Sequence, residues 1–200
     1  MQLSELQLDF LKENFNIGVG RGAKVLNSML SSHINLSVPE IELVDKLNGS
    51  YFPHLSSSIA TVDLEFNGSL AGTCKLLFPA DSALNLVRQV SGEDEGERET
   101  DFDPMSEGVL KEIGNIVLNS VMGVIGNTLD IQLQYTVPTF KECQVEELID
   151  KSYFSDESTA LLARICFSIE VMDIRGEILT LFRLGSFSEL LSLIDKKIDA

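Results

Sequence analysis

The chain repeats itself at an offset of 99 residues, and this repeat constrains its fold more than any other feature. Residues 9–39 align with residues 108–138 without a gap and share nine identities in 31 positions. Unrelated segments of this length rarely agree so well. We therefore predict one domain over residues 1–200, built from two copies of a single unit, approximately 1–92 and 103–200, packed about a pseudo-two-fold axis.

Each copy begins with the pattern of a long helix. Ser4 and Gln7 form a capping box, and apolar residues then recur at helical spacing, which predicts a helix over residues 5–30. Asp103 is followed by a proline, and this pair is typical of a helix start. The second long helix is therefore expected over residues 104–125.

Strand-like segments follow each long helix, and turn residues separate them. The expected strands cover residues 41–44, 59–66, 70–78, 140–145, 161–172 and 178–184. The expected turns are Asn67-Gly68 and 173–176, and two shorter helices should begin at Asp81 and at a Ser186–Glu189 capping box. Because tight turns join neighbouring strands, we predict an α+β fold in which two long helices pack on a largely antiparallel six-stranded sheet.

The charge of the chain excludes several classes of partner. It contains 15 Lys and Arg against 31 Asp and Glu, a net charge of −16. Affinity for nucleic acids or anionic membranes depends on clustered cations, so neither partner is expected. An acidic connector at 91–101 has no apolar residue and should be a solvated linker between the copies. It lacks the ligand spacing of an EF-hand, which disfavours a calcium loop.

The N-terminal sequence and the cysteines indicate a cytoplasmic protein. No basic and apolar leader begins the chain, and no apolar run reaches the ~20 residues of a membrane span. Cys74, Cys143 and Cys166 are odd in number and far apart, so we expect reduced structural thiols rather than disulfides or a zinc site.

One polar pair recurs in both copies and marks the candidate functional site. Glu13 with Asn16, and Glu112 with Asn115, share the spacing i, i+3, which places each pair on one helix face. Asp9 extends the first face by one turn. A single Glu-x-x-Asn is usually an ordinary exposed surface, but most surface positions differ between the copies while this pair is kept.

The glycines of the first helix suggest close approach by another surface. Gly18 and Gly22 are expected to allow helix-to-helix packing, whereas Gly20 falls on the face of Glu13 and Asn16 and would let another protein approach. An apolar stripe of Leu6, Phe10 and Ile17 should lie beside this face and reach the core.

No residue set in the sequence supports a nucleophilic or cofactor-dependent enzyme. The glycines at 18–22 have the wrong spacing for a dinucleotide loop and follow no strand. His33 and His54 occupy loop-like contexts without an obvious Ser or Asp partner.

The two polar segments resemble the signatures of the CheC, CheX and FliY family of chemotaxis phosphatases. Residues 11–20 are similar to the first signature, residues 110–116 to the second, and the Leu-Ser-Val-Pro at 36–39 to the entry of the first strand. Two signatures without a motor-binding domain are most similar to stand-alone CheC. Phe15 stands where the family has a small residue and should crowd the first site, and Gly108 stands where it has Ser or Asp.

This resemblance implies hydrolysis of the phospho-aspartate on a CheY-type response regulator. Asn16 and Asn115 would position the attacking water, and Glu13 and Glu112 would pair with a regulator lysine. The chain would bind no cofactor, since the regulator would supply the Mg²⁺. The alternatives are a non-catalytic module that binds the regulator or the deamidase CheD, and a flagellar switch component. The CheD-docking helix of some relatives would fall at 139–150, which is short here.

Overall fold

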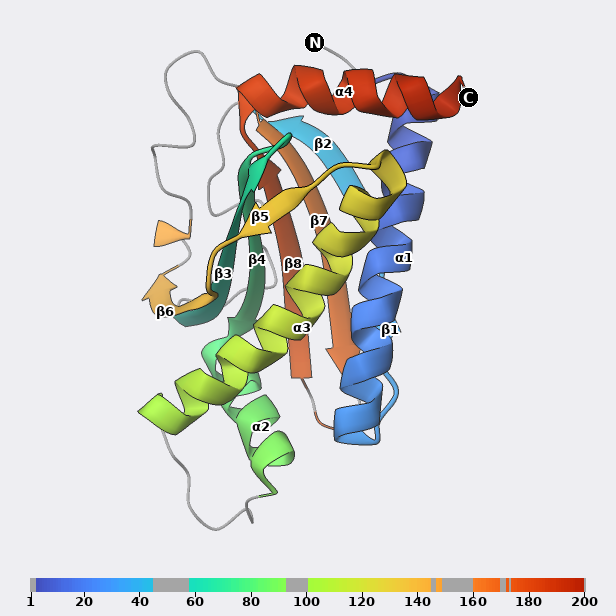
Figure 1. Cartoon of the computed structure of the whole chain (residues 1–200). Coiled ribbons are helices and arrows are strands. Elements are labelled where there is room, and N and C mark those ends of the chain that lie inside the picture. Colours follow the sequence, from blue (N-terminus) through green and yellow to red (C-terminus); the bar gives the residue numbers. More distant parts are fainter. Residues whose placement is uncertain are drawn as a thin grey trace.

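Helices cover one antiparallel sheet in the computed structural model of the chain (Figure 1). It describes residues 3–44, 58–92, 101–144, 147–148, 160–169, 172 and 174–199. The helices in this part are α1 (Glu5–Leu30), α2 (Ala80–Ser91), α3 (Pro104–Leu129) and α4 (Leu184–Ile198). The strands are β1 (Asn35–Leu36), β2 (Glu40–Val44), β3 (Ser58–Gly68), β4 (Gly72–Pro79), β5 (Leu133–Tyr135), β6 (Thr139–Gln144), β7 (Ala160–Ile169) and β8 (Ile174–Phe182).

The sheet has eight strands, so the predicted number of six is wrong. They occupy six positions, which we call rows, because two short strands share each outer position. Its order is β1-β7-β8-β4-β3-β5, while β2 also pairs with β7 and β6 also pairs with β3. All of these pairs are antiparallel, as predicted. Each outer row is broken at a Val-Pro, because proline has no backbone N–H to donate to the ladder.

The two breaks are bridged in the same way at opposite edges of the sheet. Ser37 N donates to Cys166 O at 2.9 Å, and Cys166 N donates to Ser37 Oγ at 2.9 Å. Thr136 N donates to Glu65 O at 3.0 Å, and Glu65 N donates to Thr136 Oγ1 at 3.1 Å. A hydroxyl residue before each Val-Pro thus keeps the broken row attached to its neighbour.

The strand order is symmetric between the two halves of the chain. Replacing each strand by its counterpart in the other half gives the same order, read from the opposite edge of the sheet. The pairs β1/β2 and β5/β6 then swap places, as do β3 with β7 and β4 with β8. A pseudo-two-fold axis between β4 and β8 requires this order. The division into copies at 1–92 and 103–200 stays a prediction from the sequence.

The long helices α1 and α3 lie on the same face of the sheet and pack against each other (Figure 1). A Cβ on Gly18 would lie 2.7 Å from Val121 Cα, and one on Gly22 would lie 3.3 Å from Val117 Cα. The later glycine on α1 faces the earlier valine on α3, so the two helices run in opposite directions. Two glycines therefore let the helix backbones approach closely, as the sequence suggested.

The predicted apolar stripe on α1 is wrong for Leu6 and Ile17, and only Phe10 packs against the core. Leu6 is 64% exposed and Ile17 is 40% exposed, while Phe10 is only partly buried. The buried face runs through a different set, namely Leu11, Phe15, Gly18, Val19, Gly22 and Leu26. Both faces of α1 carry apolar residues, and Gly18 and Gly22, which carry little hydrophobic signal, mark the buried one.

The predicted starts hold for the long helices and fail for the short ones. The capping box at Ser4 is confirmed, and α1 has the predicted bounds. Asp103 caps α3, which runs to Leu129 instead of residue 125. By contrast, Pro79 rather than Asp81 is the N-cap of α2. The capping box at Ser186 is also wrong, because α4 begins at Leu184 directly after β8.

Both predicted turns are displaced. Asn67 and Gly68 still belong to β3, where they pair with β5, so the β3–β4 connection lies at 69–71. The second turn is expected at 173–176, yet β8 already begins at Ile174. Gly68 has a φ of +126°, and a Cβ there would lie 2.7 Å from Gln132 O, so this end of β3 requires glycine.

One described helix, α3, is long and apolar enough to cross a membrane by length and composition alone. The sequence predicted none. Half of its apolar window is buried inside the fold, where α3 packs on α1 and β3. The hydrophobic core therefore accounts for its apolar character.

Most of the acidic connector, including residues 93–100, lies outside the described residues, as does the calcium-loop alternative.

The three cysteines are free thiols, as predicted. Burial raises the pKa of Cys74 from 9.0 to about 12, with a partial offset from Thr180 Oγ1, 3.0 Å from its sulfur. Burial also raises the pKa of half-buried Cys143 and Cys166. All three therefore favour the protonated thiol in the folded state.

We predict that Cys74 resists alkylation at mildly alkaline pH until the protein unfolds, because the thiolate is the reactive form. A variant carrying Cys143→Ser and Cys166→Ser leaves Cys74 as the single thiol, and mass spectrometry then measures its modification. The raised pKa also predicts a stability contribution that is complete below pH 9.0 and is lost as the pH rises toward about 12. Rapid labelling of Cys74 in the folded variant would contradict the predicted resistance to alkylation.

Candidate functional site

The first predicted site lies on the outer face of α1. Asp9, Glu13, Asn16 and Gly20 are all exposed, and nothing lies within 4 Å of a Cβ placed on Gly20. The face is therefore open to a partner. Ile17 adds apolar surface beside the polar pair, and Leu6 adds it two helical turns before Glu13.

The second predicted site lies on α3 and is arranged similarly. Glu112 is exposed and Asn115 is half-buried. Met105, which corresponds to Leu6 at the offset of 99, is 57% exposed, while Val109 and Ile116 are partly buried. Each site therefore combines at least one carboxylate, one carboxamide and apolar neighbours on one helix.

The two sites are separate along the packed helices. Gly18 faces Val121 and Gly22 faces Val117, so Asn115 lies level with residue 24 of α1. That level is eight residues beyond Asn16, or about 12 Å along the helix axis at 1.5 Å per residue. The two amides therefore cannot act on one small group together, and each site must work alone.

The second site lacks the additional carboxylate that Asp9 gives the first. Gly108 occupies the corresponding position, with nothing within 4 Å of a Cβ there. Ser106 is 2% exposed and is used in the helix cap: its N and Oγ donate to Asp103 Oδ1 at 2.7 and 2.6 Å. These hydrogen bonds lower the pKa of Asp103. Glu107 lies 3.7 Å from Lys111. Neither Ser106 nor Glu107 replaces Asp9.

A contact that the sequence interpretation missed restrains Asn115. Asn119 Nδ2 donates to Asn115 Oδ1 at 2.6 Å and to Asn115 O at 2.8 Å. Gly20 occupies the corresponding place in the first site. The i, i+4 spacing of two carboxamide-bearing residues was the signal available in the sequence.

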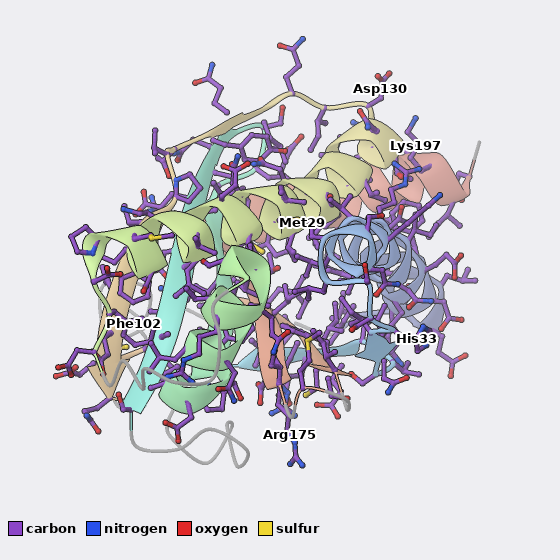
Figure 2. All side chains as sticks on the ribbon, turned by 90° about the horizontal axis from the view of Figure 1, so that it is seen from below. Met29, His33, Phe102, Asp130, Arg175 and Lys197 are labelled. Atoms are coloured by element: carbon purple, nitrogen blue, oxygen red, sulfur yellow. The ribbon has the colours of Figure 1, made fainter. Side chains whose placement is uncertain are left out.

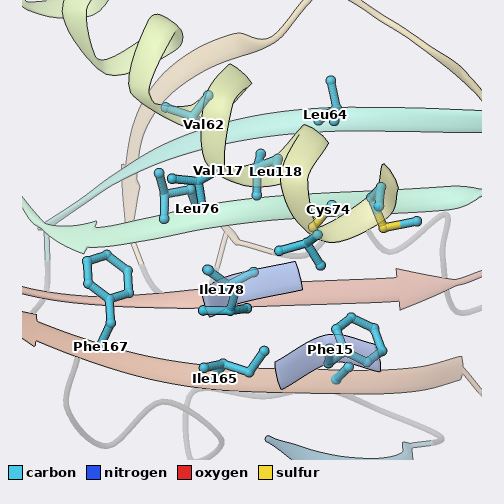
Figure 3. Packing of buried hydrophobic residues seen from close by; sticks show 14 of the residues in the cluster. Phe15, Val62, Leu64, Cys74, Leu76, Val117, Leu118, Ile165, Phe167 and Ile178 are labelled. Atoms are coloured by element: carbon cyan, nitrogen blue, oxygen red, sulfur yellow. The ribbon is translucent and has the colours of Figure 1, made fainter. Parts of the chain in front are cut away.

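Phe15 does not crowd the first site, contrary to the prediction. Its side chain is 0% exposed and lies among the buried residues over the sheet (Figure 3). At the corresponding Gly114, a Cβ would lie 2.4 Å from Val62 Cγ1. Residues at this register therefore face the sheet and differ between the copies to suit the core.

The described residues contain no group of three or more His, Cys, Asp and Glu that could hold a metal ion. His33 is exposed beyond the end of α1 (Figure 2), and His54 lies outside the described residues. Chemically, the two helix faces offer carboxylates that can bind a cation. They also offer amides that can both donate and accept hydrogen bonds without a change in protonation.

Solved structures share this fold. The middle domain of FliM from H. pylori has a TM-score of 0.70 at 13% identity, covering 96% of this chain and 99% of that chain. Thermotoga maritima FliY has a TM-score of 0.74 at 17% identity, covering 98% and 100%. The CheX–CheY–BeF3–Mg complex from Borrelia burgdorferi includes a chain with a TM-score of 0.55 at 20% identity, covering 86% and 96%.

A relative at higher identity narrows the assignment from a shared fold to one family. The chain is 31% identical over 148 residues to the CheY-P phosphatase CheC of Bacillus subtilis. The alignment covers 68% of this chain and 66% of that relative's length. No protein-family model matches the chain. Because of this relative and the shared fold, we conclude that the chain belongs to the CheC, CheX and FliY family.

Proposed function

We propose that the chain is a phosphatase for a phosphorylated CheY-type response regulator in cytoplasmic chemotaxis signalling. The observation that carries the proposal is the duplicated Glu and Asn pair, exposed or partly exposed on two helices of a fold shared with CheX. The CheC relative is named a CheY-P phosphatase, and the CheX structure is a complex with CheY.

In this proposal the carboxamides orient the attacking water. Hydrolysis of a phospho-aspartate needs a water molecule in line with phosphorus. The Oδ1 atom of Asn16 or Asn115 can accept a hydrogen bond from that water and hold it in place, which lowers the entropic part of the barrier. The chain needs no nucleophile of its own, because the regulator already carries the phosphoryl group.

The remaining chemistry is assigned to the regulator. Its own carboxylates would hold the Mg²⁺ ion, which neutralises phosphate charge, and its lysine would meet Glu13 or Glu112. This division agrees with a net charge of −16 on the phosphatase, since the cations come from the other protein. Asp9 would strengthen the first site for the same lysine, and Gly20 would leave room for the regulator surface.

The proposal is tested by following phosphate release from each of the organism's phosphorylated receiver domains, with and without the chain. We expect one receiver to lose its phosphate faster when the chain is added. No acceleration for any receiver would contradict the proposal.

We predict that Glu13→Gln with Glu112→Gln raises the KM for the regulator and weakens its dependence on salt, with less effect on kcat. The carboxylates attract a cation, and exposed charges are screened above the Debye length of about 8 Å at physiological ionic strength. Stopped-flow measurements across a salt series give both parameters.

A matched control is Glu42→Gln. Glu42 is exposed on β2, where its neighbours Ile41 and Leu43 pack against the core, so its side chain points to the side of the sheet away from α1. It should leave the KM unchanged. Because the double variant loses two charges and Glu42→Gln loses one, an equal effect per charge lost would mean that only total charge matters.

A second candidate function is binding without catalysis. The likeness to FliM and the missing counterpart of Asp9 at Gly108 favour it. Its partner would be the phosphorylated regulator or CheD. A stable complex that forms without faster phosphate release would support this candidate. Of residues 139–150, where a CheD-docking helix would fall, Thr139–Gln144 form β6, and residues 145–146 and 149–150 lie outside the described residues.

A further inference from the structure

The amide of Asn119 is held in one orientation by the backbone of α3. Its Nδ2 atom lies 2.8 Å from the carbonyl oxygen of Asn115, which can only accept a hydrogen bond. The end of the Asn119 amide nearest Asn115 must therefore be the NH₂ group. The carbonyl contact removes the usual ambiguity between the two ends of an amide.

The orientation of Asn119 in turn fixes that of Asn115. The same Nδ2 atom lies 2.6 Å from Asn115 Oδ1, so this side chain must present its oxygen to Asn119. Its NH₂ group then points away from Asn119. The oxygen keeps a second lone pair, which remains able to accept a hydrogen bond from water.

Among the described residues, no counterpart of Asn119 restrains the first site. Gly20 stands where Asn119 stands in the second copy, and a Cβ there would have no neighbour within 4 Å. Asn16 is exposed, and no side chain at position 20 can reach its amide. The two otherwise similar sites therefore differ in how firmly the carboxamide is held.

We propose that Asn119 is a positioning residue that holds the Asn115 carboxamide ready for reaction, whereas Asn16 must be ordered after the regulator has bound, as the complex reaches the transition state. This inference rests on the proposed phosphatase function. Ordering one side chain costs enough to change a rate by roughly threefold to tenfold. The second site is thus prearranged, which offsets its lack of a residue equivalent to Asp9.

The test isolates one site at a time. In an Asn16→Ala background, Asn119→Ala should lower kcat for phosphate release by roughly threefold to tenfold and leave the KM unchanged. Asn119→Gly should have the same kinetic effect, which separates the lost amide from altered helix stability. In an Asn115→Ala background, Gly20→Asn is compared with Gly20→Ala, because either side chain takes room from the regulator and only asparagine carries an amide. The Gly20→Asn variant should have the higher kcat of the two by a similar factor.

The restraint itself is measured without the regulator. We expect NMR order parameters to show a more rigid side-chain amide for Asn115 than for Asn16, and Asn119→Ala to remove the difference. Equal rigidity in the free protein would overturn the inference. So would an unchanged kcat after Asn119→Ala, or an inactive second site. If the unaltered chain accelerates no receiver, the phosphatase proposal fails, and the NMR result alone decides whether Asn119 holds Asn115.

Discussion

The combined variant Asn16→Ala and Asn115→Ala should return regulator dephosphorylation to its intrinsic rate. Each substitution removes the group that orients water in one site, and a loss on the order of 100-fold is expected when a reacting group is no longer positioned. Because the two sites lie about 12 Å apart along the helices and act separately, either single variant should keep part of the activity. Stopped-flow phosphate release measures all three forms.

The matched control for this pair is Asn127→Ala. Asn127 is also on α3 and exposed, but it lies outside both Glu and Asn pairs. It should keep full activity. Circular dichroism should show that the double variant folds normally, since Asn16 is exposed and Asn115 only half-buried. Full activity in a folded double variant would show that the amides do not carry the reaction.

Gly18→Val should strongly destabilise the fold. A Cβ at Gly18 would lie 2.7 Å from the Val121 backbone, which cannot move aside as the tip of a side chain can. The helices α1 and α3 would have to separate, and overpacking of this kind costs about 3 kcal/mol. Urea unfolding followed by circular dichroism measures the loss as a lower midpoint.

The control substitution is Gly123→Val, which makes the same change within α3. Nothing lies within 4 Å of a Cβ at Gly123, so only helix propensity changes, and valine is slightly better than glycine there. Its midpoint should stay the same or rise slightly. Equal midpoints for both valine variants would show that Gly18 is not needed for helix contact.

The sequence predicts the long helices well because their ends carry local signals. The Ser4 capping box and the Asp103 cap are each read from neighbouring residues, and both helix starts are confirmed. The starts of α2 and α4 carry no side-chain cap, so the nearest polar residues, Asp81 and Ser186, were misleading. Local signals fail where a helix simply continues from a strand.

The buried face of α1 could not be predicted in the same way. Leu6 and Ile17 look like core residues by type, whereas Gly18 and Gly22 look like weak points of a helix. The close approach of α3 reverses both interpretations, and this approach depends on residues about 100 positions away. The broken outer rows also depend on pairing with distant β7 and β3.

The candidate site was found through duplication and not through any single residue. Glu13, Asn16, Glu112 and Asn115 stand on the accessible sides of their helices. The sequence shows that Asn119 stands in place of Gly20, but only the structure shows that its side chain bonds to Asn115. A difference between copies, here Gly20 against Asn119, is the signal for sites that are alike but unequal.

Turnover by a trace amount of the chain tests the central claim most directly. With phosphorylated regulator in large excess, a phosphatase should release phosphate from all of it at a rate proportional to the chain concentration. The combined Asn16→Ala and Asn115→Ala variant should leave decay at the intrinsic rate. Accelerated release that stops at one or two phosphates per chain, or equal turnover by the double variant, would contradict the account.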